Sequence, residues 1–205
     1  MGLEAKCRAA CGEQTGEGKL QLEGESLLFR GDFLLMIARA EMKRVAAEGE
    51  SLVVETGSAR ARFELGAAAP KWVDKILHPP SLLDKLGVKA GSKVSLIGAF
   101  DAAFLAELRS RGDVGARPRK ESDLVLLLAS TPADLDGIPR AASFLAPAGG
   151  LWIVYPKGLK TITEMGVLRA GRAAGLKDNK VASFSATHTA LRFVIPVADR
   201  RDVGR

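Results

Sequence analysis

Short apolar segments alternate with glycine-containing or charged turns between Gly16 and Leu65. Residues 59–65 (ARARFEL) alternate small or apolar side chains with charged ones, the period of two that is typical of a half-buried strand. Segments of this kind recur roughly every ten residues, which favours an antiparallel sheet or small barrel. The stretch 37–50 (IARAEMKRVAAEGE) would suit a helix by composition. We interpret it as strand-like because the segments on both sides pair naturally as hairpins.

The pattern changes after Gly66, where residues 67–78 (AAAPKWVDKILH) predict an amphipathic helix. Its apolar stripe has helical spacing, Pro70 suits the first turn, and Pro79 and Pro80 end the helix. Residues 1–79 are therefore predicted to form an α+β domain, a small barrel closed by a C-terminal helix. This architecture resembles the pleckstrin-homology-like (PH-like) superfold. No motif carries that resemblance, and a PH-like fold by itself assigns no ligand.

In the early strands of this domain, acidic side chains are at least as frequent as basic ones. The charged residues there are Glu17, Lys19, Glu23, Glu25 and Arg30. A phosphoinositide site would need a cluster of Lys and Arg there. We therefore favour a protein partner or an intramolecular role over lipid binding.

Residues 80–205 have an alternating β–α pattern. The predicted strands are 94–98, 123–129 and 151–155, and the predicted helices are 102–112, 132–145 and 163–176, followed by two strands around the turn ATHT (186–189). The strand DLVLLLA is apolar throughout, as expected of a central parallel strand that is covered on both faces. The second predicted domain is therefore an α/β, Rossmann-like sheet that ends in a β-hairpin.

The segments DLVLLLAS, GGLWIVYP and ALRFVIP, in this order, resemble the second half of class I S-adenosylmethionine-dependent methyltransferases, over roughly Ser92 to Val197. The pattern KLGVKAG, VSLIG, LWIVYPK and LRFVIP is similar, more closely, to a bacterial family known only as a domain of unknown function. The first resemblance implies an S-adenosylmethionine site. The second implies no established activity.

Two features depart from the methyltransferase pattern. The cofactor loop after the first strand normally reads Gly-x-Gly-x-Gly, so that backbone can approach the ligand, whereas here it reads Gly98-Ala99-Phe100-Asp101. We expect Phe100 to occupy the space that a cofactor would need. Between Gly112 and Asp123 there is room for one short strand, so the second helix, the third strand and the acidic ribose ligand are predicted to be missing.

In an open α/β sheet, ligands bind at the carboxyl ends of the strands. The residues predicted to meet at this possible ligand crevice are Gly98, Asp101, Ser130, Tyr155, Lys157 and His188. An imidazole, an ammonium and a carboxylate could bind an anion or perform acid–base chemistry. Four of these residues also have a structural interpretation: Asp101 and Ser130 suit helix N-caps, Lys157 a solvated loop, and Tyr155 the core or its rim. The sequence contains no recognisable catalytic triad, P-loop or metal-ligand set, so we assign no catalytic or metal-binding residue.

The basic residues are concentrated in the second domain. Residues 1–79 contain 11 Lys and Arg against 12 Asp and Glu, whereas residues 80–205 contain 19 against 12. The clusters RPRK (117–120) and DRRDVGR (199–205) could mark an anion or nucleic-acid site. Nucleic acid is disfavoured because aromatic residues, which stack on bases, make up only 5% of the chain.

Cys7 and Cys11 are interpreted as free thiols of a reduced compartment. No segment has the length and apolar character of a signal peptide or a membrane span, so we expect a cytoplasmic protein. The leading hypothesis is a non-catalytic binding or scaffold protein with a degenerate methyltransferase-like domain, no cofactor and an unknown partner, possibly a protein. The alternative is a small S-adenosylmethionine-dependent methyltransferase, or another nucleotide-binding enzyme with an atypical glycine loop.

Overall fold

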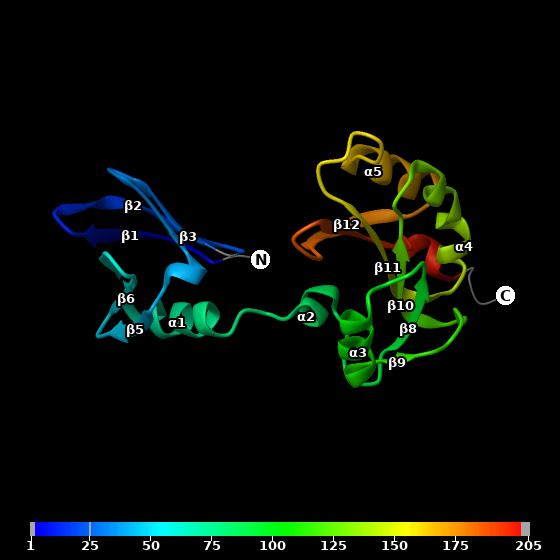
Figure 1. The fold of residues 1–205 in the computed structure, drawn as a ribbon, viewed down its shortest axis with the longest axis horizontal. Helices are drawn as coiled ribbons and strands as arrows, with labels where there is room; N and C mark the ends of the chain where they lie inside the picture. The colour runs from blue at the N-terminus through cyan, green and yellow to red at the C-terminus, as the bar shows by residue number, and fades with distance from the viewer. Residues whose placement is uncertain (1–2, 25, 202–205) are drawn as a thin grey trace. The chain divides into compact units, whose positions relative to one another are not determined.

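The computed structural model describes residues 3–24 and 26–201. The chain divides into two compact units, Met1–Pro79 and Pro80–Arg205. Figure 1 shows the fold of each unit, and each is described by itself.

The first unit is an antiparallel sheet followed by a helix (Figure 1). The seven strands lie in the order β4-β3-β2-β1-β7-β6-β5. The elements are β1 (Glu4–Cys11), β2 (Gln14–Glu23), β3 (Ser26–Gly31), β4 (Leu34–Ala38), η1 (Arg39–Glu41), β5 (Arg44–Glu48), β6 (Ser51–Glu55), β7 (Arg60–Glu64), η2 (Gly66–Ala68) and α1 (Ala69–Leu77). The antiparallel sheet and its closing helix are thus confirmed. The sheet is not a closed barrel, because β4 and β5 are not hydrogen-bonded neighbours.

The first strand, β1, was missed by the sequence analysis, which began the sheet at Gly16. Its eight residues pair with β2 along their whole length, and Ala9 to Cys11 also pair with β7. The sequence of β1 does alternate weakly between small and charged side chains. Its small side chains Ala5, Cys7 and Ala9 face the apolar core. Small side chains give little hydrophobic contrast, so this strand depends on its neighbours for stability.

The strand-like interpretation of residues 37–50 is confirmed, with one exception. β4 and β5 occupy half of the stretch, residues 37–38 and 44–48, and a single turn of 3₁₀-helix, η1, lies between them. The helix-forming residues here do not form an α-helix because burial in the sheet outweighs local propensity.

The core of the first unit lies between the sheet and α1. Leu20, Phe29, Leu52 and Phe63 are almost fully buried, and Trp72 of α1 packs into the same cluster. Pro70 lies in the first turn of α1, as predicted.

The second unit is a mixed six-stranded sheet with helices against it (Figure 1). Its elements are α2 (Leu82–Leu86), β8 (Lys93–Ile97), α3 (Ala102–Arg111), β9 (Asp113–Val114), β10 (Ser122–Leu128), η3 (Pro132–Gly137), α4 (Ile138–Ala142), β11 (Leu145–Pro156), α5 (Glu164–Ala173), β12 (Lys177–Ser183), β13 (His188–Val194) and η4 (Val197–Arg201).

The strand order β12-β13-β11-β10-β8-β9 is that of a Rossmann-like sheet with an antiparallel final hairpin. The strands β9, β8, β10 and β11 are parallel to one another, and β13 is antiparallel to β11. β9 is only two residues long, and residues 115–121 contain no helix or strand. The predicted deletion after the first β–α unit is therefore confirmed.

Both faces of this sheet are covered. Leu124, Leu126 and Trp152 point into a cluster with α2 and α3, whereas Val125 and Ile153 point into a second cluster with α4 and α5. The prediction that β10 is buried on both faces is correct.

The prediction of one helix over residues 132–145 is wrong in the type of helix and in its length. Residues 132–137 form the 3₁₀-helix η3, α4 is only five residues long, and Leu145 already belongs to β11. Pro139 lacks an amide N–H and allows a new helix start, but it could not continue a regular helix from η3. None of the described helices is long and apolar enough to cross a membrane.

Candidate functional site

The turn after β8 brings backbone to the carboxyl edge of the sheet. Gly98 has a left-handed φ of 100°, and a Cβ placed on it would lie 2.8 Å from the Cβ of Leu128 on the neighbouring strand. Only glycine fits this turn without strain. Gly98 and Ala99 are both exposed. The strand order reverses between β8 and β10, the position where ligands bind in open α/β sheets.

Phe100 does not cover Gly98 in the way that the sequence analysis expected. Its ring packs against Phe104 of α3 and Phe184, with ring centroids 5.5 and 6.1 Å away. Hydrophobic burial on this face of the sheet holds the ring, and the glycine stays open to solvent. The sequence could not show this, because Phe184 comes from the final hairpin.

Of the two predicted crevice residues that suit helix caps, Asp101 is a cap and Ser130 is not. Asp101 is the N-cap of α3 and accepts a hydrogen bond of 2.8 Å from the amide of Phe104. Ser130 is not the cap before Pro132. That position is taken by Thr131, and Asp134 accepts the amide hydrogen bonds of both Ser130 and Thr131. These hydrogen bonds, those of Thr131 foremost, lower the pKa of the Asp134 carboxyl.

Lys157 and His188 belong to one polar turn at the end of β11 and the start of β13. The Lys157 ammonium donates to the hydroxyl of Ser183 and to the carbonyl of Ser185, at 2.9 and 2.7 Å. His188 Nδ1 lies 2.9 Å from the Thr187 hydroxyl. The ammonium therefore helps to hold the hairpin turn, and Lys157 is exposed, as expected.

Tyr155 contributes the most unusual polar group of the edge. It is 3% exposed, and its hydroxyl is buried without a hydrogen-bond partner in the described residues. It lines a cavity of about 400 Å³ together with Lys157, Thr163, Glu164 and Thr189. Burial, and then the negative charge of Glu164, raise the pKa of Tyr155 to about 12. The phenol is thus protonated at neutral pH, and it is a buried hydrogen-bond donor of a residue that lines this cavity.

This titration can be measured selectively, since Tyr155 is the only tyrosine of the chain. We expect the tyrosinate ultraviolet absorbance of the native protein to rise with a midpoint near pH 12, and near pH 10 in denaturant. The unfolded chain loses its phenolic proton first, so Tyr155 makes folding less favourable as the pH rises from about 10 to about 12. A native midpoint near 10 would contradict the burial of the hydroxyl.

Five of the six predicted crevice residues form two groups at the carboxyl edge. Gly98 and Asp101 follow β8, whereas Tyr155 lies on β11, Lys157 directly follows β11, and His188 begins β13. β10 and the residues after it, including Ser130, separate the groups. In the described part of the chain, no set of three or more His, Cys, Asp or Glu side chains could hold a metal ion.

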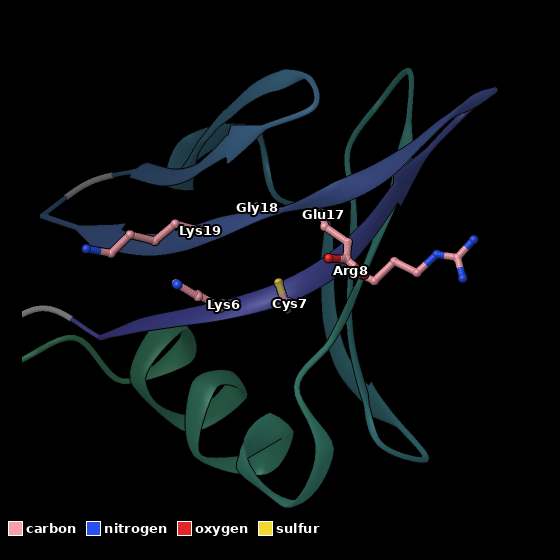
Figure 2. Close-up of a pocket in the computed structure, with 6 residues that line it drawn as sticks. All are labelled: Lys6, Cys7, Arg8, Glu17, Gly18 and Lys19. Carbon is pink, nitrogen blue, oxygen red and sulfur yellow. The ribbon is translucent and has the colours of Figure 1, made fainter.

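The first unit has a groove that the sequence analysis missed. It has a volume of about 510 Å³ and is lined by Lys6, Cys7, Arg8, Glu17, Gly18 and Lys19 of β1 and β2. Figure 2 shows Lys6 and Lys19 extending in one direction from neighbouring strands, and Arg8 in the other. Lys19 forms a 2.7 Å ion pair with Glu4. Of the early-strand residues considered above, Glu25 lies outside the described residues.

The cysteine in this groove is not a reactive thiol. Burial, and then the nearby charge of Glu64, raise the pKa of Cys7 to about 11. A protonated thiol is a poor nucleophile and metal ligand. Cys7 and Cys11 are both free, on the same strand.

The basic cluster 117–120 has structural contacts of its own. Arg119 forms a 3.0 Å ion pair with Asp113, and the ammonium of Lys120 donates to the carbonyl of Ser143 at 2.7 Å. The cluster therefore anchors the loop after β9. In the other cluster, residues 202–205 lie outside the described part of the chain.

No family model matches this chain, and no curated protein matches it. The resemblance to a bacterial family of unknown function therefore gains no support from family models. Among solved structures, a SAM-dependent methyltransferase from Aquifex aeolicus is similar at 14% identity, with 60% of this chain and 93% of that chain covered and a TM-score of 0.48.

Two further structures match other extents of the chain. The fibrillarin pre-rRNA processing protein of Methanococcus jannaschii is 12% identical over 85% of this chain and 95% of its own, with a TM-score of 0.38. A structure describing the PH and C1 domains of the Vav1 exchange factor is 12% identical over 42% of this chain and 28% of its own, with a TM-score of 0.32. Similarities this low assign no function to this chain.

Proposed function

We propose that residues 80–205 bind an adenosyl ligand, such as S-adenosylmethionine or S-adenosylhomocysteine, at the turn after β8. The observation that carries this proposal is the exposed, left-handed Gly98 at the point where the strand order reverses. A close backbone approach of this kind admits a ligand that a side chain would exclude. The groups that would hold the ligand are the backbone of Gly98 and Ala99 and the residues after β10.

The site fits such a ligand only in part. No acidic side chain lies between the end of β9 and Lys120, so the ribose hydroxyls would lack their usual carboxylate acceptor. We therefore expect weak binding, in the micromolar range.

We further propose that this unit works by binding rather than by methyl transfer. Asp101 is engaged as a helix cap and Lys157 in the hairpin turn, so neither is free to act as a base. The phenol of Tyr155, with its pKa of about 12, stays protonated at neutral pH. The competing candidate, a small methyltransferase, is favoured by the cavity at Tyr155 and Glu164, which lies at the same edge and could hold a methyl acceptor.

Calorimetric titration of the full chain with each adenosyl ligand tests the proposal. We expect saturable binding that Ala99→Trp abolishes, because the indole would fill the open turn. Ala106→Trp, on an exposed position of α3, is the matched control and should bind like the wild type. Gly98 itself is a poor site for the test, because any side chain there clashes with Leu128.

Absence of binding, or equal binding by both tryptophan variants, would contradict the proposal. Release of S-adenosylhomocysteine from S-adenosylmethionine, dependent on the protein, would favour the methyltransferase candidate.

We propose that residues 1–79 are a PH-like interaction module whose partner is a protein. The strand order with its closing helix α1 supports the PH-like assignment. The groove is lined by three basic residues, Lys6, Arg8 and Lys19, against one carboxylate, Glu17, and this excess of positive charge suits an acidic protein surface. Co-purification from the native host with Lys6→Glu/Arg8→Glu in the full chain tests the proposal. An unchanged set of co-purifying proteins would argue against it.

A further inference from the structure

A second pocket of the Rossmann-like unit lies at the amino ends of its parallel strands, the edge opposite to Gly98. It has a volume of about 520 Å³, and we call it the amino-edge pocket. Its lining comes from residues 86–92, the start of β10, residues 146–149 of β11, and one residue each of β12 and β13. Its charged lining residues are Lys89, Lys180 and Arg192 against a single carboxylate, Asp123. The pocket therefore has an excess of positive charge.

Two of the three basic side chains of this pocket, Lys180 and Arg192, lie in a defined row. Arg192 of β13 is directly opposite Trp152 of β11 and Lys180 of β12, so the three side chains project from the same face of the sheet. Trp152 Nε1 donates to the carbonyl of Leu86 at 2.9 Å, and Lys180 Nζ donates to the carbonyl of Lys85 at 2.6 Å. The last two residues of α2 thus hold the side chains of Trp152 and Lys180 in place. Each ammonium has three donors, so Lys180 has further hydrogen bonds to offer.

Arg192 is a partly buried guanidinium without a carboxylate partner among the described residues. Its side-chain hydrogen bond goes to the neutral amide oxygen of Asn179, at 3.4 Å. Three other arginines of this unit each have a carboxylate partner: Arg111 with Asp84, Arg119 with Asp113, and Arg172 with Asp178. Burial, and then the positive charge of Arg200, lower the pKa of Arg192. A cation in such surroundings gains from a bound anion.

The single carboxylate of the pocket does not neutralise Arg192. Asp123 Oδ2 accepts a hydrogen bond of 2.8 Å from the amide of Lys93, which fixes the start of β8. Asp123 forms no ion pair with Arg192 in the described residues.

The absence of a side chain at Gly150 leaves room for the guanidinium of Arg192. A Cβ on Gly150 would lie 2.5 Å from Arg192 Nε and 2.6 Å from Nη2. The side chain of Arg192 therefore lies directly against the backbone of β11, which is possible only because residue 150 has no side chain. This contact aligns the planar fork of donors beside the pocket.

We propose that the amino-edge pocket binds the phosphoryl group of a small phosphorylated ligand through Arg192, Lys180 and Lys89. Arginine donates two parallel hydrogen bonds to a phosphate, and lysine adds point charge. The pocket volume lies within the range of small-molecule sites, and it exceeds the space that a phosphate alone requires. This site is separate from the proposed adenosyl site, since the two lie at opposite edges of the sheet.

Titration of the full chain with inorganic pyrophosphate at low ionic strength tests the proposal by calorimetry. We expect one saturable site, and Arg192→Gln should weaken it by about tenfold or more. Arg169→Gln is the matched control, because it removes the same charge from an exposed position of α5 that does not line the pocket. It should change the affinity by less than about twofold. No saturable binding, or equal weakening by both variants, would overturn the proposal.

Gly150→Ala gives a second variant that leaves every charge in place. The added methyl group displaces the end of the flexible Arg192 side chain, so the fold should persist while pyrophosphate binding weakens several-fold. In an NMR titration of the wild type, the side-chain Nε–H resonance of Arg192 should shift with pyrophosphate. Binding that leaves this resonance unmoved would also overturn the proposal. Arg192→Gln should not change the affinity for S-adenosylhomocysteine, so a failure here is distinguishable from a failure of the proposed function.

Discussion

Replacing Trp152 with alanine should lower the free energy of unfolding by about 4 kcal/mol. Trp152 is fully buried between the sheet and α2, and its indole N–H donates to the carbonyl of Leu86. The substitution would open a large cavity and leave that carbonyl without its partner. Urea denaturation of the full chain, followed by far-ultraviolet circular dichroism, measures the loss in the transition of the second unit.

Trp152→Phe keeps most of the buried ring and removes only the hydrogen bond, so it should cost about 1–2 kcal/mol. The stability of Trp152→Phe can still be measured if Trp152→Ala fails to fold. A loss below about 1 kcal/mol for Trp152→Ala would show that the indole does not anchor α2.

Gly171→Ala should lower the free energy of unfolding by about 2 kcal/mol, although alanine favours helices. Gly171 is buried on α5, and a Cβ there would lie 2.2 Å from Cε1 of Phe193. Phe193 is itself fully buried, so its ring cannot move aside without disturbing the core. Thermal and urea denaturation of the full chain measure the effect.

The matched control lies on the same helix. A Cβ on Gly166 would meet only the Thr163 hydroxyl, at 3.4 Å. Gly166→Ala should therefore leave the stability unchanged or raise it by up to about 1 kcal/mol. Equal effects at both glycines would mean that α5 does not pack on Phe193 as described.

Periodicity predicted the elements whose hydrophobic contrast is strong. The strand at Arg60–Glu64 and the apolar strand β10 were found because alternation and continuous burial are local signals. β1 was missed because its inward side chains are small. The helix over 132–145 was predicted too long, since the sequence did not reveal that β11 begins at Leu145.

The candidate sites depend on contacts between distant segments, which a single sequence does not display. The ring of Phe100 packs against Phe184, more than eighty residues later in the chain, and Gly98 is exposed. Arg192 has no local sequence feature that marks it as a site residue. That no carboxylate of the described residues pairs with it becomes apparent only once β13 is placed between β11 and β12. The Gly149-Gly150 pair was visible, but its role beside Arg192 was not.

If the turn after β8 binds an adenosyl ligand, as we propose, amide NMR spectra of the full chain will respond to titration with S-adenosylhomocysteine. We expect the largest saturable shifts on the amides of Gly98, Ala99 and Ser130. Spectra that do not change, or shifts confined to the first unit or to the amino-edge pocket, would contradict this proposal.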